Sequence, residues 1–185
     1  MILQHLPNLI TALRIVLVVP LAWSLLEHNF DIALLLVFIA AISDALDGFL
    51  AKHYGWTSTL GSVLDPLADK LLLVVTFLSL GYLALVPAWL VVAVLARDII
   101  IVTGGVAYYI SIGRFDMAPT LLSKLNTLMQ LVLVFGIVLA QVFDFPRMWM
   151  IEIGWWIVLA TTLMSGIDYV WTWGRNAWRA RDQHD

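Results

Sequence analysis

The chain has 185 residues, of which 62% are hydrophobic and 12% are charged, with a net charge of −3 and a mean hydropathy of +0.95. A soluble domain carries roughly 45–50% apolar and about 25% charged residues, so the composition excludes an ordinary soluble protein and predicts one integral membrane domain over residues 1–185. The sequence has no cysteine, which excludes disulfides, a thiol nucleophile and thiolate metal ligands.

Six apolar segments are each long enough to cross a bilayer, which takes about 20 mostly apolar residues. They cover residues 8–27, 31–53, 60–84, 87–111, 119–143 and 147–173. The expected fold is therefore all-α, with six transmembrane helices. The opening stretch MILQHLPNLITALR shows no signal-peptide or transit-peptide pattern, so the first segment is expected to remain in the mature protein.

The distribution of basic residues predicts the orientation of these segments. With both termini in the cytoplasm, the cytoplasmic side carries Lys52, Arg114, Lys124, Arg175, Arg179 and Arg181. The opposite side then carries only Arg147. We therefore expect cytoplasmic termini, and a bacterial inner membrane is the simplest location.

The stretch DALDGFLAKHYGWTSTLGSVLDPLADK places two pairs of aspartates where the second segment ends and the third begins. They are Asp44 and Asp47, then Asp65 and Asp69. Residues three or four apart share a helix face, so each pair can point inward, and consecutive helices run antiparallel. We expect the four carboxylates to meet in a polar cavity just inside the cytoplasmic boundary.

Four carboxylates at this depth need a counter-charge, because each costs about 2.5–3.5 kcal/mol in hydrocarbon. Lys52 and Lys70 are too few and too peripheral to neutralise them. Oxygen-only ligation favours Mg²⁺ or Mn²⁺ over Ca²⁺, and two such ions form a clamp suited to phosphoryl chemistry. The structural alternative is a set of ion-paired acids.

Two glycines flank the carboxylates, Gly48 directly after Asp47 and Gly61 one turn before Asp65. Small residues allow helix backbones to approach closely in membranes. They also allow a ligand to lie against the backbone. Both roles remain open from the residues alone.

The same stretch resembles the signature D-x-x-D-G-x-x-A-R-x8-G-x-x-x-D-x-x-x-D of the CDP-alcohol phosphatidyltransferase family. The matching residues are Asp44, Asp47, Gly48, Ala51, Gly61, Asp65 and Asp69. Lys52 stands where the family has arginine. Lysine keeps the positive charge but lacks the bidentate fork of a guanidinium.

The resemblance implies transfer of a phosphatidyl group from CDP-diacylglycerol to an alcohol, with release of CMP. It also implies six transmembrane helices, a homodimer, and a cavity open to cytoplasm and membrane. It assigns the metal to Asp44, Asp47 and Asp65, while Asp69 acts as the base and also contributes to the second ion. The CDP-lipid is expected to contact Asn8, Thr11 and Arg14 on the first segment, together with Gly48, Ala51, Lys52 and Gly61.

The acceptor alcohol is expected to bind Arg97 on the fourth segment and Lys124 and Asn126 on the fifth. A structural pair between Arg97 and Asp98 or Asp168 is the alternative. The motif Ser123-Lys124-Leu125-Asn126-Thr127-Leu128-Met129-Gln130 resembles the S-K-x-N-T-x-x-Q of eukaryotic-type cardiolipin synthases more than the G-K-x-K-T-x-x-Q of phosphatidylglycerophosphate synthases. Phosphatidylglycerol is therefore the expected acceptor, with glycerol 3-phosphate as the first alternative and serine, inositol phosphate or another alcohol as the remaining ones.

Membrane lipids are the expected partners, and no nucleic-acid partner is expected. Intramembrane acids also occur in cation transporters, which favour internal repeats and midplane sites. This sequence shows no repeat, and its acids gather at one boundary. A cation transporter and a non-catalytic homologue remain the remote alternatives.

Overall fold

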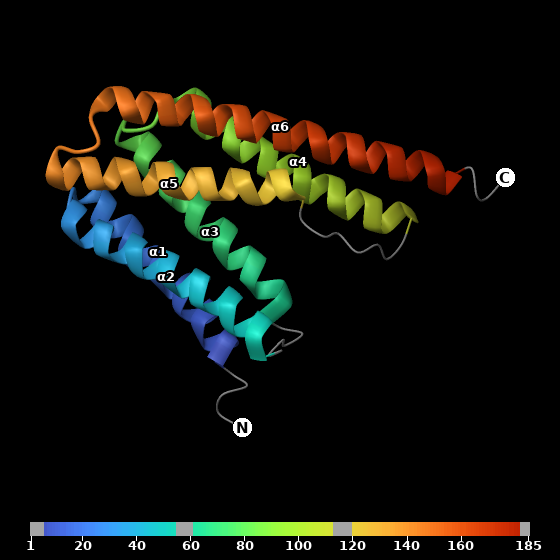
Figure 1. Ribbon diagram of the computed structural model, residues 1–185, viewed down its shortest axis with the longest axis horizontal. Coiled ribbons are helices and arrows are strands. Elements are labelled where there is room, and N and C mark those ends of the chain that lie inside the picture. The colour runs from blue at the N-terminus through green and yellow to red at the C-terminus, as the bar shows by residue number, and fades with distance from the viewer. Residues whose placement is uncertain (1–5, 55–60, 113–119, 182–185) are drawn as a thin grey trace. The chain divides into compact units, whose positions relative to one another are not determined.

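The computed structural model describes residues 6–54, 61–112 and 120–181, with side chains placed for 12–43, 68, 70–105 and 120–172. All secondary structure in these ranges is helical, which confirms the all-α prediction (Figure 1). The helices are α1 (Leu6–Leu26), α2 (Phe30–Tyr54), α3 (Gly61–Tyr82), α4 (Ala88–Ile112), α5 (Leu121–Phe143) and α6 (Met148–Arg181).

The helix ends agree with the predicted segments to within two residues, except at the end of α6. There the prediction stopped at Trp173 because the apolar run ends, whereas the helix continues to Arg181. Arginine and alanine are strong helix formers, and they recur in the sequence after Gly174. A polar helical extension can therefore follow a span with no change of backbone conformation.

The first turns of α2 and α5 each form a hydrogen bond to the residue that precedes the helix. Asn29 precedes α2, and its carbonyl accepts the first helical bond from the N–H of Ala33 at 3.0 Å. The side-chain oxygen of Thr120 accepts a bond of 3.2 Å from the N–H of Ser123, which caps α5. Asparagine and threonine are favoured at this position because they satisfy otherwise unpaired N–H groups. The cap on α5 fixes the turn that carries Ser123 and Lys124.

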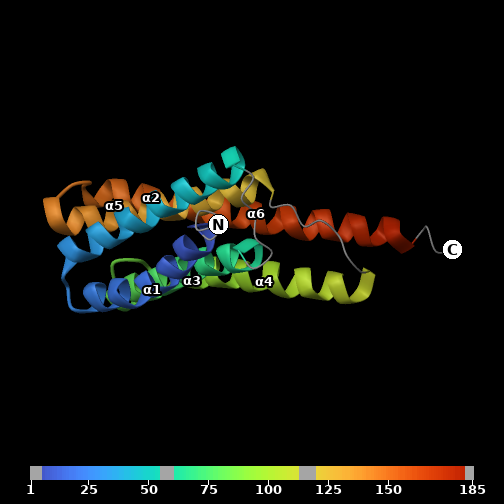
Figure 2. The same ribbon diagram turned by 90° about the horizontal axis from the view of Figure 1, so that it is seen from below.

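The first compact unit comprises Met1–Val86 and Val134–Ile151. Within it α1 packs against both α2 and α3 (Figures 1 and 2). The buried side of α1 carries Val18, Leu21 and Leu25, which recur at helical spacing. Burial of this apolar stripe, with matching stripes on α2 and α3, provides the core of the unit.

The second compact unit comprises Pro87–Leu133 and Glu152–Asp185 and contains α4, the first part of α5 and most of α6. Gly154 allows α6 to approach α5 closely, since a Cβ there would lie 2.9 Å from Cδ1 of Leu133. Trp89 and Trp156 stack at a centroid distance of 5.3 Å and join α4 to α6. Within this unit α6 therefore contacts both α4 and α5.

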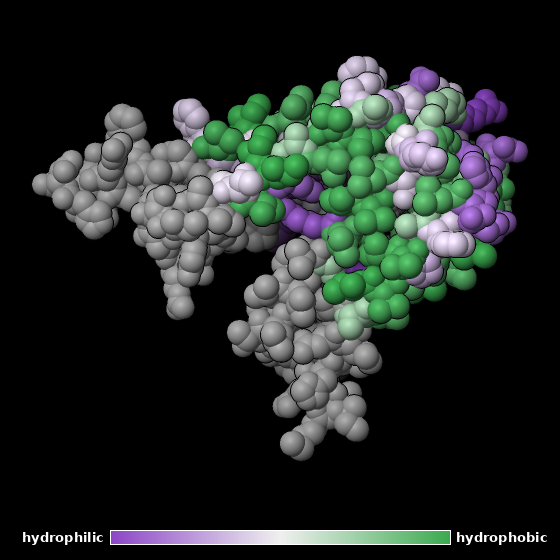
Figure 3. Space-filling view, turned by 180° about the vertical axis from the view of Figure 1, so that it is seen from behind, coloured by the Kyte–Doolittle hydropathy of each residue, from purple (hydrophilic) through white to green (hydrophobic). Residues whose placement is uncertain are grey.

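The described surface is rich in large apolar side chains, which include Val19, Trp23, Val92 and Ile167. Figure 3 shows hydrophobic residues over a large part of one described face. Several polar side chains are buried instead, which is the distribution expected when hydrocarbon rather than water surrounds the helices.

Three helices are long and apolar enough to cross a membrane by their described residues, over Ala88–Gly105, Leu121–Phe143 and Met148–Thr172. The other three contain shorter described apolar stretches, Ala12–Leu26, Phe30–Ser43 and Lys70–Tyr82. The helices thus indicate a membrane-associated protein. Six complete spans remain a prediction.

Candidate functional site

The signature aspartates lie on two helices of the first unit. Asp44 and Asp47 belong to α2, and Asp65 and Asp69 belong to α3. Both helices pack against α1. The four side chains are outside the described residues, so the prediction that they converge is not tested. The same holds for the side chains of Asn8, Thr11, Gly48, Ala51, Lys52 and Gly61.

Arg14 is the predicted CDP-lipid residue of α1 whose side chain is described, and it is only 2% exposed. It lies four residues before Val18 and therefore continues the buried stripe of α1 toward the start of the helix. Burial of a guanidinium is favourable only beside groups that compensate its charge. Its position on the packed side of α1 fits a residue that binds carboxylate or phosphate oxygens.

Arg97 joins all three helices of the second unit. Its Nη1 donates to the Asp98 carboxylate at 2.6 Å, and its Nη2 donates to the hydroxyls of Ser123 at 2.7 Å and Ser165 at 2.6 Å. The guanidinium also lies 5.9 Å from the ring centroid of Tyr169, within cation–π range. The structure therefore contains the Arg97–Asp98 pair that the sequence offered as an alternative. A role for Arg97 in acceptor binding stays a prediction.

Asn126 is completely buried and connects α5 to α6. Its Oδ1 accepts hydrogen bonds from the hydroxyls of Thr161 at 3.0 Å and Thr162 at 2.9 Å. Lys124, two residues earlier on α5, is exposed. The two predicted acceptor residues of α5 thus occupy different environments, one inside the unit and one at its surface.

We did not predict the polar residues of α6 from the sequence. Thr162, Ser165 and Tyr169 are buried and recur at spacings of three and four residues, so they share one face. The periodic recurrence of these polar residues in an otherwise apolar segment is the sequence feature from which they could have been predicted. Hydrogen bonds join Arg97 to Ser123 and Ser165, and Asn126 to Thr162. We call these residues and the buried Gln130 of α5 the polar seam.

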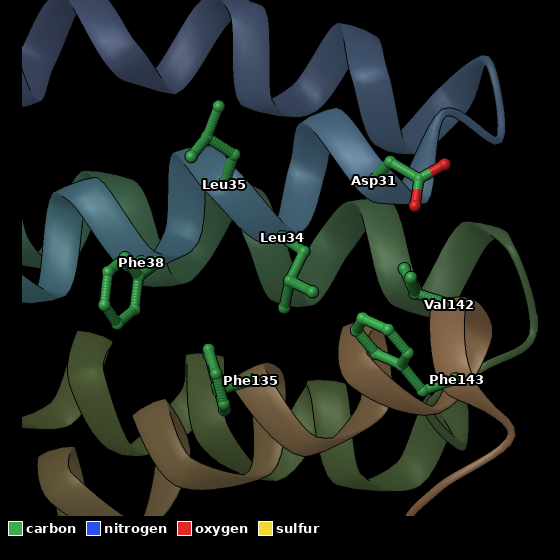
Figure 4. Close-up of a pocket in the computed structure, with 7 residues that line it drawn as sticks. All are labelled: Asp31, Leu34, Leu35, Phe38, Phe135, Val142 and Phe143. Atoms are coloured by element: carbon green, nitrogen blue, oxygen red, sulfur yellow. The ribbon is translucent and has the colours of Figure 1, made fainter.

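A cavity of about 360 Å³ lies in the first unit between the beginning of α2 and the end of α5 (Figure 4). Its lining consists of Asp31, Leu34, Leu35, Phe38, Phe135, Val142 and Phe143. One carboxylate among apolar side chains offers neither several metal ligands nor a phosphate-binding surface. This cavity is therefore not suited to phosphoryl transfer, and Asp31 provides a control position on α2.

Among the described residues, no group of three or more Asp, Glu or His side chains could hold a metal ion. The four signature aspartates remain the metal-binding candidates, and carboxylates are the donors that Mg²⁺ and Mn²⁺ prefer. Their donor chemistry fits such ions, with the two pairs on helices that share the neighbour α1.

Residues 4–166 match the sequence model of the family described as CDP-alcohol phosphatidyltransferase. This match covers both aspartate pairs and the polar seam. The chain belongs to this family.

Relatives in the family include the cardiolipin synthase (CMP-forming) of Rattus norvegicus, 33% identical over 181 residues. The alignment covers 88% of this chain and 59% of that relative. The cardiolipin synthase (CMP-forming) of Homo sapiens is 32% identical, with 88% and 60% covered. The chain thus spans about three fifths of the length of these two relatives.

A further relative is the CDP-diacylglycerol–glycerol-3-phosphate 3-phosphatidyltransferase of Bacillus subtilis. It is 30% identical over 181 residues, and the alignment covers 89% of this chain and 93% of the relative. The relatives therefore include proteins named cardiolipin synthase and one whose name contains glycerol 3-phosphate.

Proposed function

We propose that this protein transfers a phosphatidyl group from CDP-diacylglycerol to the hydroxyl of a glycerol-containing acceptor and releases CMP. The observation that carries the proposal is the two aspartate pairs of α2 and α3, at the spacing of the family that the chain belongs to. Family membership also argues against the cation-transporter alternative. Lys52 keeps a positive charge at the position of the family's arginine, which favours a catalytic rather than a non-catalytic protein.

The proposed reaction is a displacement at the phosphorus that bears the diacylglycerol. The acceptor oxygen forms a bond to this phosphorus, the bridging bond of the diphosphate breaks, and CMP leaves with the bonding electrons. Asp69 takes the proton of the acceptor hydroxyl, because a neutral alcohol is a weak nucleophile without a base. Arg14 and Lys52 are the basic residues proposed to bind the phosphates of the CDP-lipid.

Asp44, Asp47 and Asp65, with a contribution from Asp69, would hold two Mg²⁺ or Mn²⁺ ions. When bound, these ions neutralise charge on the diphosphate and on the departing CMP. Carboxylate oxygens from two helices are suited to this role because they leave coordination positions open for phosphate.

Phosphatidylglycerol is the acceptor that we propose first, which makes cardiolipin the product. Asn126 supports it, because a neutral amide occupies the position where the phosphatidylglycerophosphate synthase motif has a second lysine. Relatives named cardiolipin synthase at 32–33% identity support it as well. Glycerol 3-phosphate is the second candidate, supported by the Bacillus subtilis relative.

The six helices are proposed to cross the membrane as one catalytic domain over residues 1–185, with both termini in the cytoplasm. The asymmetry of basic residues supports this orientation. We further propose a bacterial inner membrane, an active site facing the cytoplasm, and a homodimer.

The test supplies purified protein and Mg²⁺ with labelled CDP-diacylglycerol and either phosphatidylglycerol or glycerol 3-phosphate. Thin-layer chromatography identifies the lipid product. We expect labelled cardiolipin with the first acceptor. If labelled phosphatidylglycerophosphate is the only product, the acceptor is glycerol 3-phosphate and not phosphatidylglycerol. Absence of any product would overturn the proposed function.

A further inference from the structure

The cavity of the first unit has a charged end and an apolar end. Asp31 lies in the first turn of α2, and three apolar residues follow on the same face of the helix, namely Leu34, Leu35 and Phe38. The rest of the lining comes from the end of α5 and consists of Phe135, Val142 and Phe143. Figure 4 shows Asp31, Val142 and Phe143 toward one end of the cavity and Phe38 and Phe135 toward the other. The one charged group is therefore confined to one end.

The cavity opens on a part of the surface that is itself apolar. Leu35, Phe38 and Phe143 are between 51% and 65% exposed although they are large apolar side chains. Ile32, on the neighbouring face of α2, is 54% exposed. A contiguous apolar surface of this kind marks a contact with a membrane or a partner protein. In a membrane protein, lipid tails can enter such a cavity from the side.

The turns around the charged end carry more acids than bases. Glu27 lies just before α2, and Asp144 and Arg147 lie between α5 and α6. These three side chains and that of Asp31 are all exposed, and none of them forms an ion pair among the described residues. With His28 counted as neutral, three carboxylates face one guanidinium. This end of the unit therefore favours a positively charged group over a negatively charged one.

A charged group above an apolar stem is the arrangement of a membrane phospholipid. Asp31 and Phe38 are two helical turns apart, a rise of roughly 10 Å along α2, which accommodates part of an acyl chain below a head group. An ammonium donates hydrogen bonds to a carboxylate, whereas a phosphoglycerol head group brings a negative phosphate and neutral hydroxyls. The carboxylate of Asp31 also interacts favourably with the helix dipole, but that interaction requires no cavity beside it.

We propose that this cavity binds a zwitterionic phospholipid whose head group ends in an ammonium, the chemistry of phosphatidylethanolamine. The ammonium contacts Asp31, and one acyl chain lies along Leu34 and Phe38 toward Phe135. Asp44, the first aspartate of the signature, lies 13 residues after Asp31 on the same helix, roughly 20 Å away along its axis. The lipid is therefore a bound ligand outside the proposed transfer reaction, and its binding does not depend on that reaction.

The test uses two probes that differ only at the amine, phosphatidylethanolamine and N-acetyl-phosphatidylethanolamine with the same acyl chains. Acetylation removes the positive charge and keeps the phosphate and the chains. Neither head group has a free hydroxyl, so neither lipid can serve as the acceptor of the proposed reaction. The full-length protein in detergent receives both probes in equal amounts, and native mass spectrometry measures the ratio of the two bound forms.

Asp31→Asn removes the charge at the cavity. Glu27→Gln is the matched control, because Glu27 carries the same charge at the same end but does not line the cavity. In the wild type and in Glu27→Gln we expect phosphatidylethanolamine to be preferred by about threefold, the size expected for one exposed ion pair. In Asp31→Asn the preference should fall below about 1.5-fold. Because both probes compete in one sample, this ratio does not depend on the fraction of folded protein.

Leu34→Trp tests the apolar part by filling the cavity. Ile32→Trp is its control, because Ile32 is exposed on the same helix and does not line the cavity. Leu34→Trp should raise the Kd for phosphatidylethanolamine by about fivefold, the effect of excluding one or two methylene groups from an apolar site. Ile32→Trp should leave this Kd within about twofold of the wild type. Circular dichroism checks that each variant is folded.

Three results would overturn the inference. The first is equal binding of the two probes to the wild type. The second is an equal loss of preference in Glu27→Gln and Asp31→Asn, which would assign the selection to the general charge of this end. The third is unchanged lipid binding in Leu34→Trp. If the proportion of dimers also falls in that variant, the cavity is the contact site of a second copy of the chain.

Discussion

The side-chain oxygen of Asn126 on α5 accepts a hydrogen bond of 2.9 Å from the hydroxyl of Thr162 on α6. Both side chains are almost fully buried, at 0% and 1% exposure. Interhelical hydrogen bonds of this kind stabilise helix pairs in membranes by roughly 0.6–2 kcal/mol. The residue that distinguishes the two acceptor motifs therefore also joins two helices, so a substitution there has both structural and functional effects.

Asn126→Lys should shift the acceptor preference toward glycerol 3-phosphate. The added cation can bind the free phosphate of glycerol 3-phosphate, a charge-assisted contact worth roughly 1.5–3 kcal/mol, whereas phosphatidylglycerol has only a diester. The measurement is the kcat/KM for glycerol 3-phosphate divided by the kcat/KM for phosphatidylglycerol. This ratio should be about tenfold or more higher in the variant than in the wild type. Thermal unfolding should show lower stability, because the two threonine hydrogen bonds are lost.

Asn126→Leu is the control for the structural part of this change. It removes the same hydrogen bonds without adding a charge, so it should lower stability and leave the free phosphate without a new contact. An equal shift toward glycerol 3-phosphate in both variants would contradict the electrostatic explanation. A wild type that already prefers glycerol 3-phosphate would show that phosphatidylglycerol is not the acceptor.

Asp44→Asn, Asp47→Asn and Asp65→Asn should each abolish divalent-dependent CMP release while the protein still folds. Each change removes one negative ligand where charge develops in the transition state. Activity is measured across a Mg²⁺ and Mn²⁺ titration, with folding followed by circular dichroism. Asp31→Asn, at the other end of α2, is the control and should retain activity. Normal activity in any two of the three variants would refute the metal assignment.

Lys52→Arg should be tolerated, with a KM for the CDP-lipid equal to or below that of the wild type. Guanidinium offers the bidentate geometry that matches phosphate oxygens, and it restores the family's residue at this position. Steady-state kinetics with varied CDP-diacylglycerol measure the effect. A tenfold loss of activity would mean that the compact ammonium of Lys52 has a role that arginine cannot perform.

Arg97→Met should lower the free energy of unfolding by about 3 kcal/mol, because it removes the guanidinium that lies 2.6 Å from the partly buried Asp98 carboxylate. Thermal unfolding in detergent measures this loss. The double variant with Asp98→Asn should recover part of the stability. If Arg97 also binds the acceptor, the double variant should still have a higher KM for the acceptor than the wild type has. An acceptor KM equal to that of the wild type in the double variant would limit Arg97 to a structural role.

The positions of the helices could be predicted because long apolar runs and turn residues mark them directly. The predicted segments 31–53 and 119–143, for example, correspond to α2 (Phe30–Tyr54) and α5 (Leu121–Phe143). The end of α6 was missed because the prediction followed hydrophobicity, whereas the helix continues through residues of high helix propensity.

The candidate site was only partly predictable, because side-chain pairing depends on contacts between distant segments. The spacing of Asp44 to Asp69 identified the family motif, yet it could not pair Arg97 with Ser165, which lies 68 residues later. Nor could the fifth segment alone show that Asn126 would accept hydrogen bonds from two threonines of α6. Such contacts follow from helix packing.

CMP release from CDP-diacylglycerol by the purified protein, with Mg²⁺ present and phosphatidylglycerol as acceptor, tests the proposed transfer most directly. We predict one CMP for each cardiolipin formed, with no release after chelation of the divalent ion and none in Asp44→Asn. Folded wild-type protein that releases no CMP with phosphatidylglycerol or with glycerol 3-phosphate would contradict the proposal.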